Sequence, residues 1–393
     1  IALGGPGAVF WCWLTGVLGM ATKYSEGLLA VKFRVKTENG EMLGGPMYAL
    51  ERGLGMKWLA ILFSVFTAIA AFGIGNMVQA NAVADLLYTD FNQPTYVTGI
   101  IITTLVGLVM LGGVKSISKV CSLLVPFMAL FYILGCIYII CCNHAHIWAA
   151  ISLIVRSAFN PEAAGGGFVG GVLITTIRYG VARGLFSNES GMGSAPIVAA
   201  AAKAKNPVRQ ALVSMTGTFW DTVIICAMTG IVLVSCLVAY PGMECSQGTG
   251  MMRAAFGTIP VVGSIVLAVG LFTFAFSTLL GWSYYGEKAI EYLGGKKVIL
   301  FYRILFVIGV FVGSILSLKA VWNIADSMNA LMAIPNLISL LLLSNVLVKE
   351  TRKYLWKKNK LGVWNKHDLE IEKLEHERKL KQARRRQARL EKQ

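Results

Sequence analysis

The residues best suited to chemistry in this sequence are hydroxyls that stand in otherwise apolar runs. Ser277 and Thr278 are adjacent in the run 254–286, and their oxygens can coordinate a hard cation such as sodium. The run lacks the softer ligands that transition metals prefer. The pair therefore predicts either a sodium site or two hydroxyls that hydrogen-bond back to their own helix.

Two amides form a second candidate group. Asn76 and Gln79 stand three residues apart in GIGNMVQAN, so a helix places them on one face. They suit a small polar solute, and they suit hydrogen bonding between helices equally well. Trp282, close after the hydroxyl pair, either walls a pocket or packs in the core.

A third group lies in GLFSNESGMGSAP at 184–196, which carries a carboxylate at Glu189. Gly180 and Gly184, beside two arginines, predict a weak helix that breaks there. A break at membrane depth is tolerated only in a protein interior or a cavity, where it exposes backbone groups to a substrate and its coupling ion. We expect a short helix to follow, capped by Ser194 with Pro196 in its first turn. Glu189 is expected to pair with a basic residue such as Arg183, as a gate or as a structural salt bridge.

Composition identifies the elements that must position these residues. Of the 393 residues, 56% are hydrophobic and 14% charged, and the mean hydropathy is +0.65, which is too apolar for a soluble domain. About 20 apolar residues of helix cross a membrane. Uncharged runs of this length lie at 1–22, 58–84, 91–114, 120–142, 254–286 and 327–348. Three more runs carry one or two charges, at 165–188, 211–240 (with Asp221) and 298–318. The chain is thus predicted to be an all-α integral membrane protein of about nine helices.

Lysine and arginine fix the expected orientation, because cytoplasmic connections are rich in them. Basic-rich and basic-poor connections alternate along the whole chain, from the first loop (Lys23 to Lys57) to the basic C-terminal end. We therefore expect the C-terminus in the cytoplasm and Ile1 outside. Because the chain begins with Ile inside an apolar run, we also expect at least one membrane segment before it.

The C-terminal end differs in composition from the rest. Residues 349–393 hold 16 Lys and Arg against 7 Asp and Glu. We expect a bundle at 1–348 and a basic cytoplasmic tail at 349–393 that lies on anionic lipid rather than on nucleic acid. The 8 cysteines show no spacing typical of a metal site or a disulfide framework, and are expected to pack as apolar residues.

Several motifs in order along the chain resemble the alanine or glycine:cation symporter family. They are GGPG at 4–7, ATKYSE at 21–26, GGPMY at 44–48, GIGNMVQAN at 73–81, GLFSNESGMGSAP at 184–196, SMTGT at 214–218, GWSYYGE at 281–287 and WNIAD at 322–326. The resemblance extends from Gly4 to about Val348.

This resemblance implies the inverted-repeat bundle of the leucine transporter, without its N-terminal helices. It also implies symport of sodium with a small neutral amino acid, alanine or glycine, by alternating access in the cell membrane. Sodium is then the coupling ion, and no other cofactor is expected. Ser277 and Thr278 match the helix that binds sodium in that fold. The residues expected to line the substrate pocket are Asn76, Gln79, Thr175, Thr176, Gly180 and Trp282.

Other functions are less well supported by the residues. A membrane enzyme would need a nucleophile and base near Glu26 or Glu189, and none stands near either in the sequence. A passive channel would be expected to show a repeated ring of charges or a filter motif, and the sequence shows neither. A proton-coupled carrier or a channel for small polar solutes is therefore kept as the alternative to sodium symport.

Overall fold

The computed structural model describes residues 1–37, 41–159, 173–243, 249–316, 318–357 and 360–363. In this part of the chain the only strands are β1 (Val35–Lys36) and β2 (Met42–Leu43), which pair antiparallel. All other regular secondary structure in the described residues is helical, which confirms the predicted all-α class. The α-helices are α1 (Ala8–Lys32), α2 (Pro46–Tyr48), α3 (Lys57–Phe72), α4 (Val78–Phe91), α5 (Thr95–Leu111), α6 (Gly113–Cys142), α7 (Ile147–Phe159), α8 (Leu173–Asn188), α9 (Ala195–Ala200), α10 (Pro207–Thr218), α11 (Ala227–Ala239), α12 (Gly250–Phe256), α13 (Gly263–Gly294), α14 (Ile299–Ile315), α15 (Leu318–Leu342) and α16 (Ser344–Thr351).

Short π-helical and 3-10 segments connect or continue several of these helices. They are η1 (Ala49–Gly53), η2 (Gly73–Met77), η3 (His144–His146), η5 (Phe219–Cys226), η6 (Lys296–Val298) and η7 (Arg352–Trp356). The π-helix η2 joins α3 to α4, and the π-helix η5 joins α10 to α11. π-Helical turns inside longer helices often mark functional sites.

Five helical stretches of the described chain are long and apolar enough to cross a membrane. They are Lys57–Phe91, Gly113–Cys142, Pro207–Ala239, Gly263–Gly294 and Lys296–Ile315. A sixth candidate is the pair Asp326–Leu342 and Ser344–Trp356, bent by 56°, and Thr95–Leu111 is a shorter apolar helix. Several predicted spans are thus helices in the structure, including the span 327–348, which falls in the bent pair. Fewer than nine stretches of the described chain are long and apolar enough to cross a membrane. Part of the predicted span 165–188 and most of the basic tail lie outside the described residues.

One predicted span begins later than expected. The run 254–286 is divided, because α12 ends at Phe256 and α13 begins at Gly263. Pro260 lacks the backbone N–H that a continuous helix would need, and Val261 has φ of 67°. The hydroxyl pair at 277–278 nevertheless lies well inside α13.

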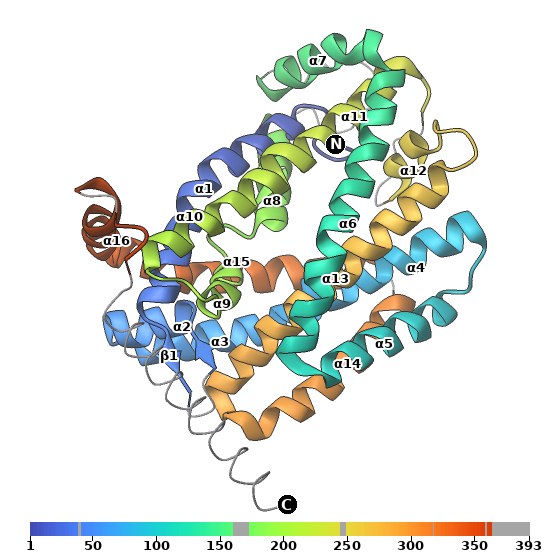
Figure 1. The fold of residues 1–393 in the computed structure, drawn as a ribbon. Coiled ribbons are helices and arrows are strands. Elements are labelled where there is room, and N and C mark those ends of the chain that lie inside the picture. The colour runs from blue at the N-terminus through green and yellow to red at the C-terminus, as the bar shows by residue number, and fades with distance from the viewer. Residues whose placement is uncertain (38–40, 160–172, 244–248, 317, 358–359, 364–393) are drawn as a thin grey trace, which may run out of the picture.

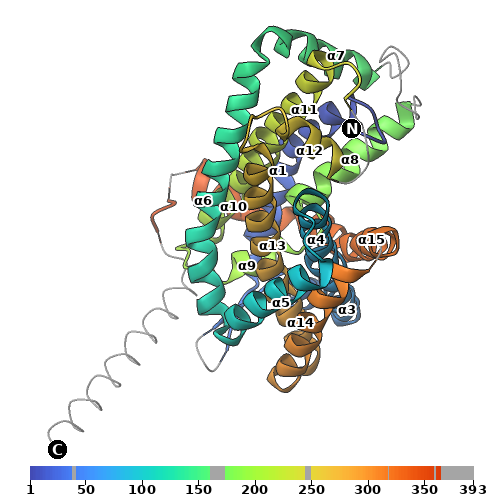
Figure 2. The same ribbon diagram turned by 90° about the vertical axis from the view of Figure 1, so that its right-hand side faces the viewer.

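The helices form two groups (Figures 1 and 2). α1, α8, α10 and α11 lie together, and α3, α4, α5 and α14 form the other group, with α13 crossing against the second. The largest apolar cluster lies in the second group and includes Phe63, Ile74, Leu279 and Trp282.

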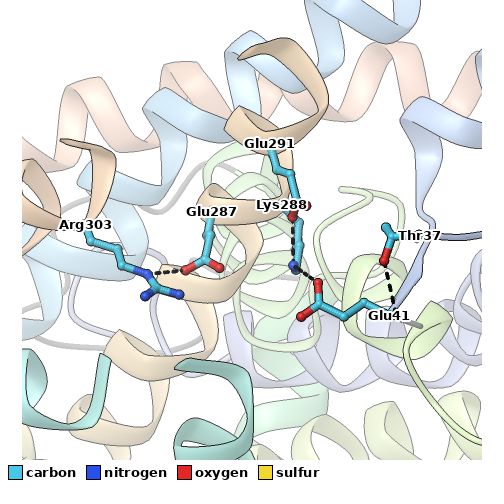
Figure 3. A network of polar contacts seen from close by, with 6 residues as sticks. All are labelled: Thr37, Glu41, Glu287, Lys288, Glu291 and Arg303. Carbon is cyan, nitrogen blue, oxygen red and sulfur yellow. Dashed lines mark hydrogen bonds and ion pairs between the residues drawn. The ribbon is translucent and has the colours of Figure 1, made fainter. Parts of the chain in front are cut away.

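The β-hairpin is tied to α13 by charged side chains (Figure 3). Lys288 is only 6% exposed and binds Glu291 at 2.8 Å and Glu41 of the hairpin at 3.6 Å. Beside it, Arg303 of α14 donates to Glu287 at 2.7 Å. The Lys288–Glu41 pair joins the hairpin to the C-terminal part of α13, and the Arg303–Glu287 pair joins α13 to the N-terminal part of α14.

Candidate functional site

The stretch at 184–196 forms the end of one helix, a turn and the start of another. α8 ends at Asn188 and α9 begins at Ala195. In between, Glu189, Gly191 and Gly193 have φ of 54°, 87° and 84°. Glycine tolerates this region of φ without a steric penalty, so the two glycines allow the chain to reverse its course here. The expected break and re-entry are therefore present, at 189–194.

The two glycines expected to weaken the helix, Gly180 and Gly184, do not break it. α8 runs without interruption through Gly180 and Gly184, and the two glycines serve close packing against α1 instead. A Cβ atom at Gly180 would lie 2.6 Å from the carbonyl oxygen of Ala8, and one at Gly184 would lie 1.9 Å from Oγ1 of Thr15. Contact with α1 thus holds these positions in the helix despite their low helix propensity.

A buried carboxylate on α1 holds the turn together. Oε1 of Glu26 accepts hydrogen bonds from the backbone N–H groups of Gly191 at 3.0 Å and Gly193 at 3.1 Å, and from Nδ2 of Asn336 at 2.6 Å. The same Asn336 amide donates to the carbonyl of Gly191 at 2.9 Å. Glu26 is 2% exposed, and its other oxygen, Oε2, is buried without a partner among the described residues. α1, the turn and α15 therefore meet at one polar point.

A lysine on the same helix binds the end of α8. Nζ of Lys23 donates to the carbonyl oxygen of Asn188 at 2.7 Å. A cation at a helix C-terminus is stabilised by the last free carbonyl groups and by the helix dipole. Lys23 and Glu26 therefore fix both sides of the break from a single neighbouring helix.

Glu189 has a different partner from the expected one. Its Oε2 accepts from Oγ of Ser194 at 2.7 Å. Ser194 stands at the predicted cap position, but this side chain binds Glu189 rather than the helix N-terminus, while Pro196 lies in the first turn as expected. Arg183 pairs with Asp326 at 3.1 Å and lies 4.5 Å from the ring centre of Trp322. Glu189 and Arg183 thus belong to separate contacts.

Asn76 and Gln79 lie at and just after the π-helix η2. Nδ2 of Asn76 donates to the carbonyl of Phe306 on α14 at 2.7 Å, and Nε2 of Gln79 donates to the carbonyl of Ile74 at 3.1 Å. Asn76 is fully buried, and its Oδ1 has no partner in the described structure. This oxygen is an acceptor that a ligand or a water molecule can satisfy.

Trp282 packs directly on this π-helix. A Cβ atom at Gly75 would lie 2.0 Å from Cβ of Trp282, so only glycine allows the contact. Trp282 is 2% exposed and belongs to the same buried apolar cluster as Ile74 of η2 and Met192 of the turn. The structure therefore brings together Trp282, the Asn76 segment and the turn after α8.

The predicted residues on α8 face another part of the bundle. Thr176 is fully buried near Gly4, and its Oγ1 has no described partner. Gly180 packs on Ala8, and Thr175 is half-buried. α8 packs mainly on α1 and η5, whereas Asn76 and Trp282 lie where η2 and α13 meet. Thr175, Thr176 and Gly180 are thus placed apart from the other pocket candidates.

The hydroxyl pair on α13 bonds back to its own helix. Oγ of Ser277 and Oγ1 of Thr278 both donate to the carbonyl of Phe274, each at 2.9 Å. A hydroxyl that donates its proton keeps its lone pairs as acceptors. Both oxygens therefore still fit the ligand preference of sodium, and the two interpretations of the pair are compatible.

Sequence reasoning missed Glu26 and Asn336 as partners of the turn. In the sequence, Glu26 stands out only as part of a motif and as a possible enzyme residue, and Asn336 lies within an apolar run. A buried carboxylate needs several donors, so an acidic residue on a helix rich in small residues was the one available hint.

The apolar helices, the break held by polar side chains and the π-helical turns η2 and η5 are typical of a multi-pass membrane protein of the transporter class. A model of the Sodium:alanine symporter family matches residues 1–367, and the chain belongs to that family. It is thus a transporter and not an enzyme.

Individual relatives agree with this assignment. The chain is 52% identical over 357 residues to the sodium/alanine symporter AgcS of Methanococcus maripaludis, covering 90% of this chain and 78% of that protein. It is 37% identical over 365 residues to the amino-acid carrier protein AlsT of Bacillus subtilis, covering 92% and 76%. It is also 37% identical over 357 residues to the probable sodium/glutamine symporter GlnT of Bacillus subtilis, covering 90% and 73%.

Proposed function

We propose that the protein carries a small neutral amino acid, alanine or glycine, into the cell together with sodium. The observation that carries this proposal is the helix break at 189–194, which lies beside Trp282 and the Asn76 segment. Breaks of this kind let transporters offer backbone groups to a substrate and its ion inside the membrane. Family membership supports sodium and an amino acid as the transported species.

The same features support a leucine-transporter-like inverted-repeat bundle that works by alternating access. In such a bundle, sodium and amino acid together stabilise a closed state that then opens to the other side. The charge pattern supports a cytoplasmic C-terminus, with the basic tail on anionic lipid.

The proposed substrate pocket is built around the contact between Trp282 and Gly75. Trp282 fills space next to the π-helix, and Oδ1 of Asn76 supplies an unsatisfied acceptor for the ammonium group of an amino acid. Gln79, Thr175, Thr176 and Gly180 complete the proposed pocket only if α8 moves toward η2 when the transporter closes. The large, tightly packed Trp282 favours amino acids with small side chains.

The proposed sodium ligands are Ser277 and Thr278. We expect replacement of both by Ala to weaken the sodium dependence of uptake about tenfold or more, because two oxygen ligands are lost. Thr104→Ala is a matched control, since this hydroxyl also bonds back to its own helix, at 2.8 Å, in another apolar helix.

Uptake of labelled alanine and glycine into proteoliposomes, at several sodium concentrations, tests this proposal. Support requires sodium-dependent uptake that the double variant weakens and Thr104→Ala does not. Uptake that a proton gradient drives without sodium would favour the proton-coupled alternative. Uptake that only follows the solute gradient would favour a channel.

A further inference from the structure

Asp221 is an acidic side chain near the middle of an apolar span, and the sites proposed above do not use it. It is the one acidic residue in Pro207–Ala239, a helical stretch that is long and apolar enough to cross a membrane. At 1.5 Å per residue it lies about 21 Å from Pro207 and about 27 Å from Ala239. An ionisable group at this depth is costly, and it usually marks an ion or substrate path.

Asp221 lies in the π-helix η5, which packs against α1 and α8. A π-helical turn widens the helix and changes the direction of its side chains. The π-helix η2, which holds Asn76, is the corresponding feature of the other helix group.

Two hydroxyls hold one oxygen of the carboxylate. Oδ2 of Asp221 accepts from Oγ of Ser187 at 2.6 Å and from Oγ1 of Thr222 at 2.8 Å. Oδ1 accepts no hydrogen bond from the described residues, and it is not among the fully buried atoms. One carboxylate oxygen is therefore fixed in position while the other is left open.

No direct counter-charge balances this carboxylate. Within the described residues, no Lys, Arg or His nitrogen lies within 4.0 Å of it. Lys23 acts on Asp221 electrostatically from further away, but its Nζ is bonded to the carbonyl of Asn188. A carboxylate that has no direct ion-pair partner in an apolar span favours a bound cation.

We infer that Asp221, Ser187 and Thr222 form a second cation site, distinct from Ser277 and Thr278, and that it binds sodium. The inference extends the proposed sodium symport. All three side chains present hard oxygen ligands, which sodium prefers and transition metals do not. The single carboxylate neutralises one positive charge, whereas a divalent cation would leave a net charge inside the membrane.

Close helix packing around the site favours a bare ion over an amino acid. A Cβ atom at Gly16 of α1 would lie 2.8 Å from Cγ2 of Thr222. Access is available from one side, since Cys226, whose Sγ lies 3.2 Å from Oγ of Ser187, also lines a cavity of about 340 Å³.

Binding of radioactive sodium to the purified protein, without amino acid, tests the inference. We expect Asp221→Asn to weaken sodium binding about tenfold or more, a loss of about 1.4 kcal/mol per factor of ten. Asp221→Glu should retain part of the affinity, and Ser187→Ala should weaken binding about threefold or more. Ser235→Ala is the matched control, because Ser235 is buried in the same span and bonds only to its own helix, at 3.0 Å to Val232.

A folded Asp221→Asn protein that binds sodium like the wild type would overturn the inference. If Asp221→Asn does not fold, the Ser187→Ala variant tests the inference instead. Sodium binding unchanged from the wild type in Ser187→Ala would also overturn the inference. Weaker alanine binding with unchanged sodium binding would assign the carboxylate to the ammonium group of the amino acid instead. The proposed function fails separately, if the wild type shows no sodium-dependent uptake or if Ser277→Ala/Thr278→Ala leaves its sodium dependence unchanged.

Discussion

Removing the Glu26 carboxylate is the perturbation whose effect is easiest to derive from the structure. Its Oε1 accepts three hydrogen bonds, from Gly191, Gly193 and Asn336, in a site that is 2% exposed. Glu26→Ala leaves three donors unpaired, and each buried unpaired donor costs about 1–3 kcal/mol. Partial relaxation of the turn reduces the total, so we expect a loss of about 3 kcal/mol or more.

Glu26→Gln should be milder. The amide keeps a carbonyl oxygen for the three donors, but it is uncharged, and its NH2 group replaces Oε2, which is buried without a described partner. We expect a loss of about 1–3 kcal/mol, from one buried unpaired donor and weaker hydrogen bonds. We therefore expect stability to decrease from the wild type to Glu26→Gln and further to Glu26→Ala.

Thermal unfolding in detergent and initial rates of alanine uptake measure the effect together. A loss of 3 kcal/mol corresponds to a fall in Tm on the order of 5 °C or more, and we expect uptake to fall with it because the turn loses its fixed shape. Glu51→Ala is the control, since that side chain is 32% exposed and bonds Tyr292 at 2.8 Å, so its removal should cost about 1 kcal/mol or less. Wild-type stability and uptake in Glu26→Ala would refute this account of the turn.

Three further predictions follow from the packing and the charges. Gly75→Ala should abolish uptake, because the new Cβ would lie 2.0 Å from Cβ of Trp282, whereas Gly281→Ala, with no atom within 4 Å, should be tolerated in the same uptake assay. The wild type should reject leucine in competition with labelled alanine, and Trp282→Phe should admit it better; equal transport of leucine and alanine by the wild type would contradict a small pocket. Lys288→Ala should cost about 3 kcal/mol in thermal unfolding, because it leaves buried Glu291 without its partner, while Glu41→Ala, at 3.6 Å and 49% exposed, should cost less than about 1 kcal/mol. Equal losses in the last two variants would show that the hairpin contact carries the stability.

The sequence predicted most of the apolar helices because length and hydropathy alone determine which segments can cross a membrane. It also located the helix break to within a few residues. Glycine signals a break and a close helix contact in the same way, so the sequence could not tell Gly180 and Gly184, which pack on α1, from Gly191 and Gly193, which form the turn. Only the position of α1 separates the two cases.

Partners from distant segments were beyond the reach of the sequence. Glu26 meets Asn336 across 310 positions, and Asn76 meets Phe306 across 230. Ser187 and Asp221 are brought together by the π-helix, whose altered turn no hydropathy pattern reveals. The candidate residues could thus be named from their chemistry, whereas their grouping depended on the packing of the helices.

Concentrative uptake of labelled alanine into proteoliposomes tests the central proposal most directly. The experiment compares an inward sodium gradient, an equal sodium concentration on both sides and an inward proton gradient without sodium, each with the wild-type full-length protein. We expect alanine to accumulate above the external concentration only with the sodium gradient, and to a greater extent with a membrane potential that is negative inside. Accumulation that is the same without sodium would contradict sodium symport.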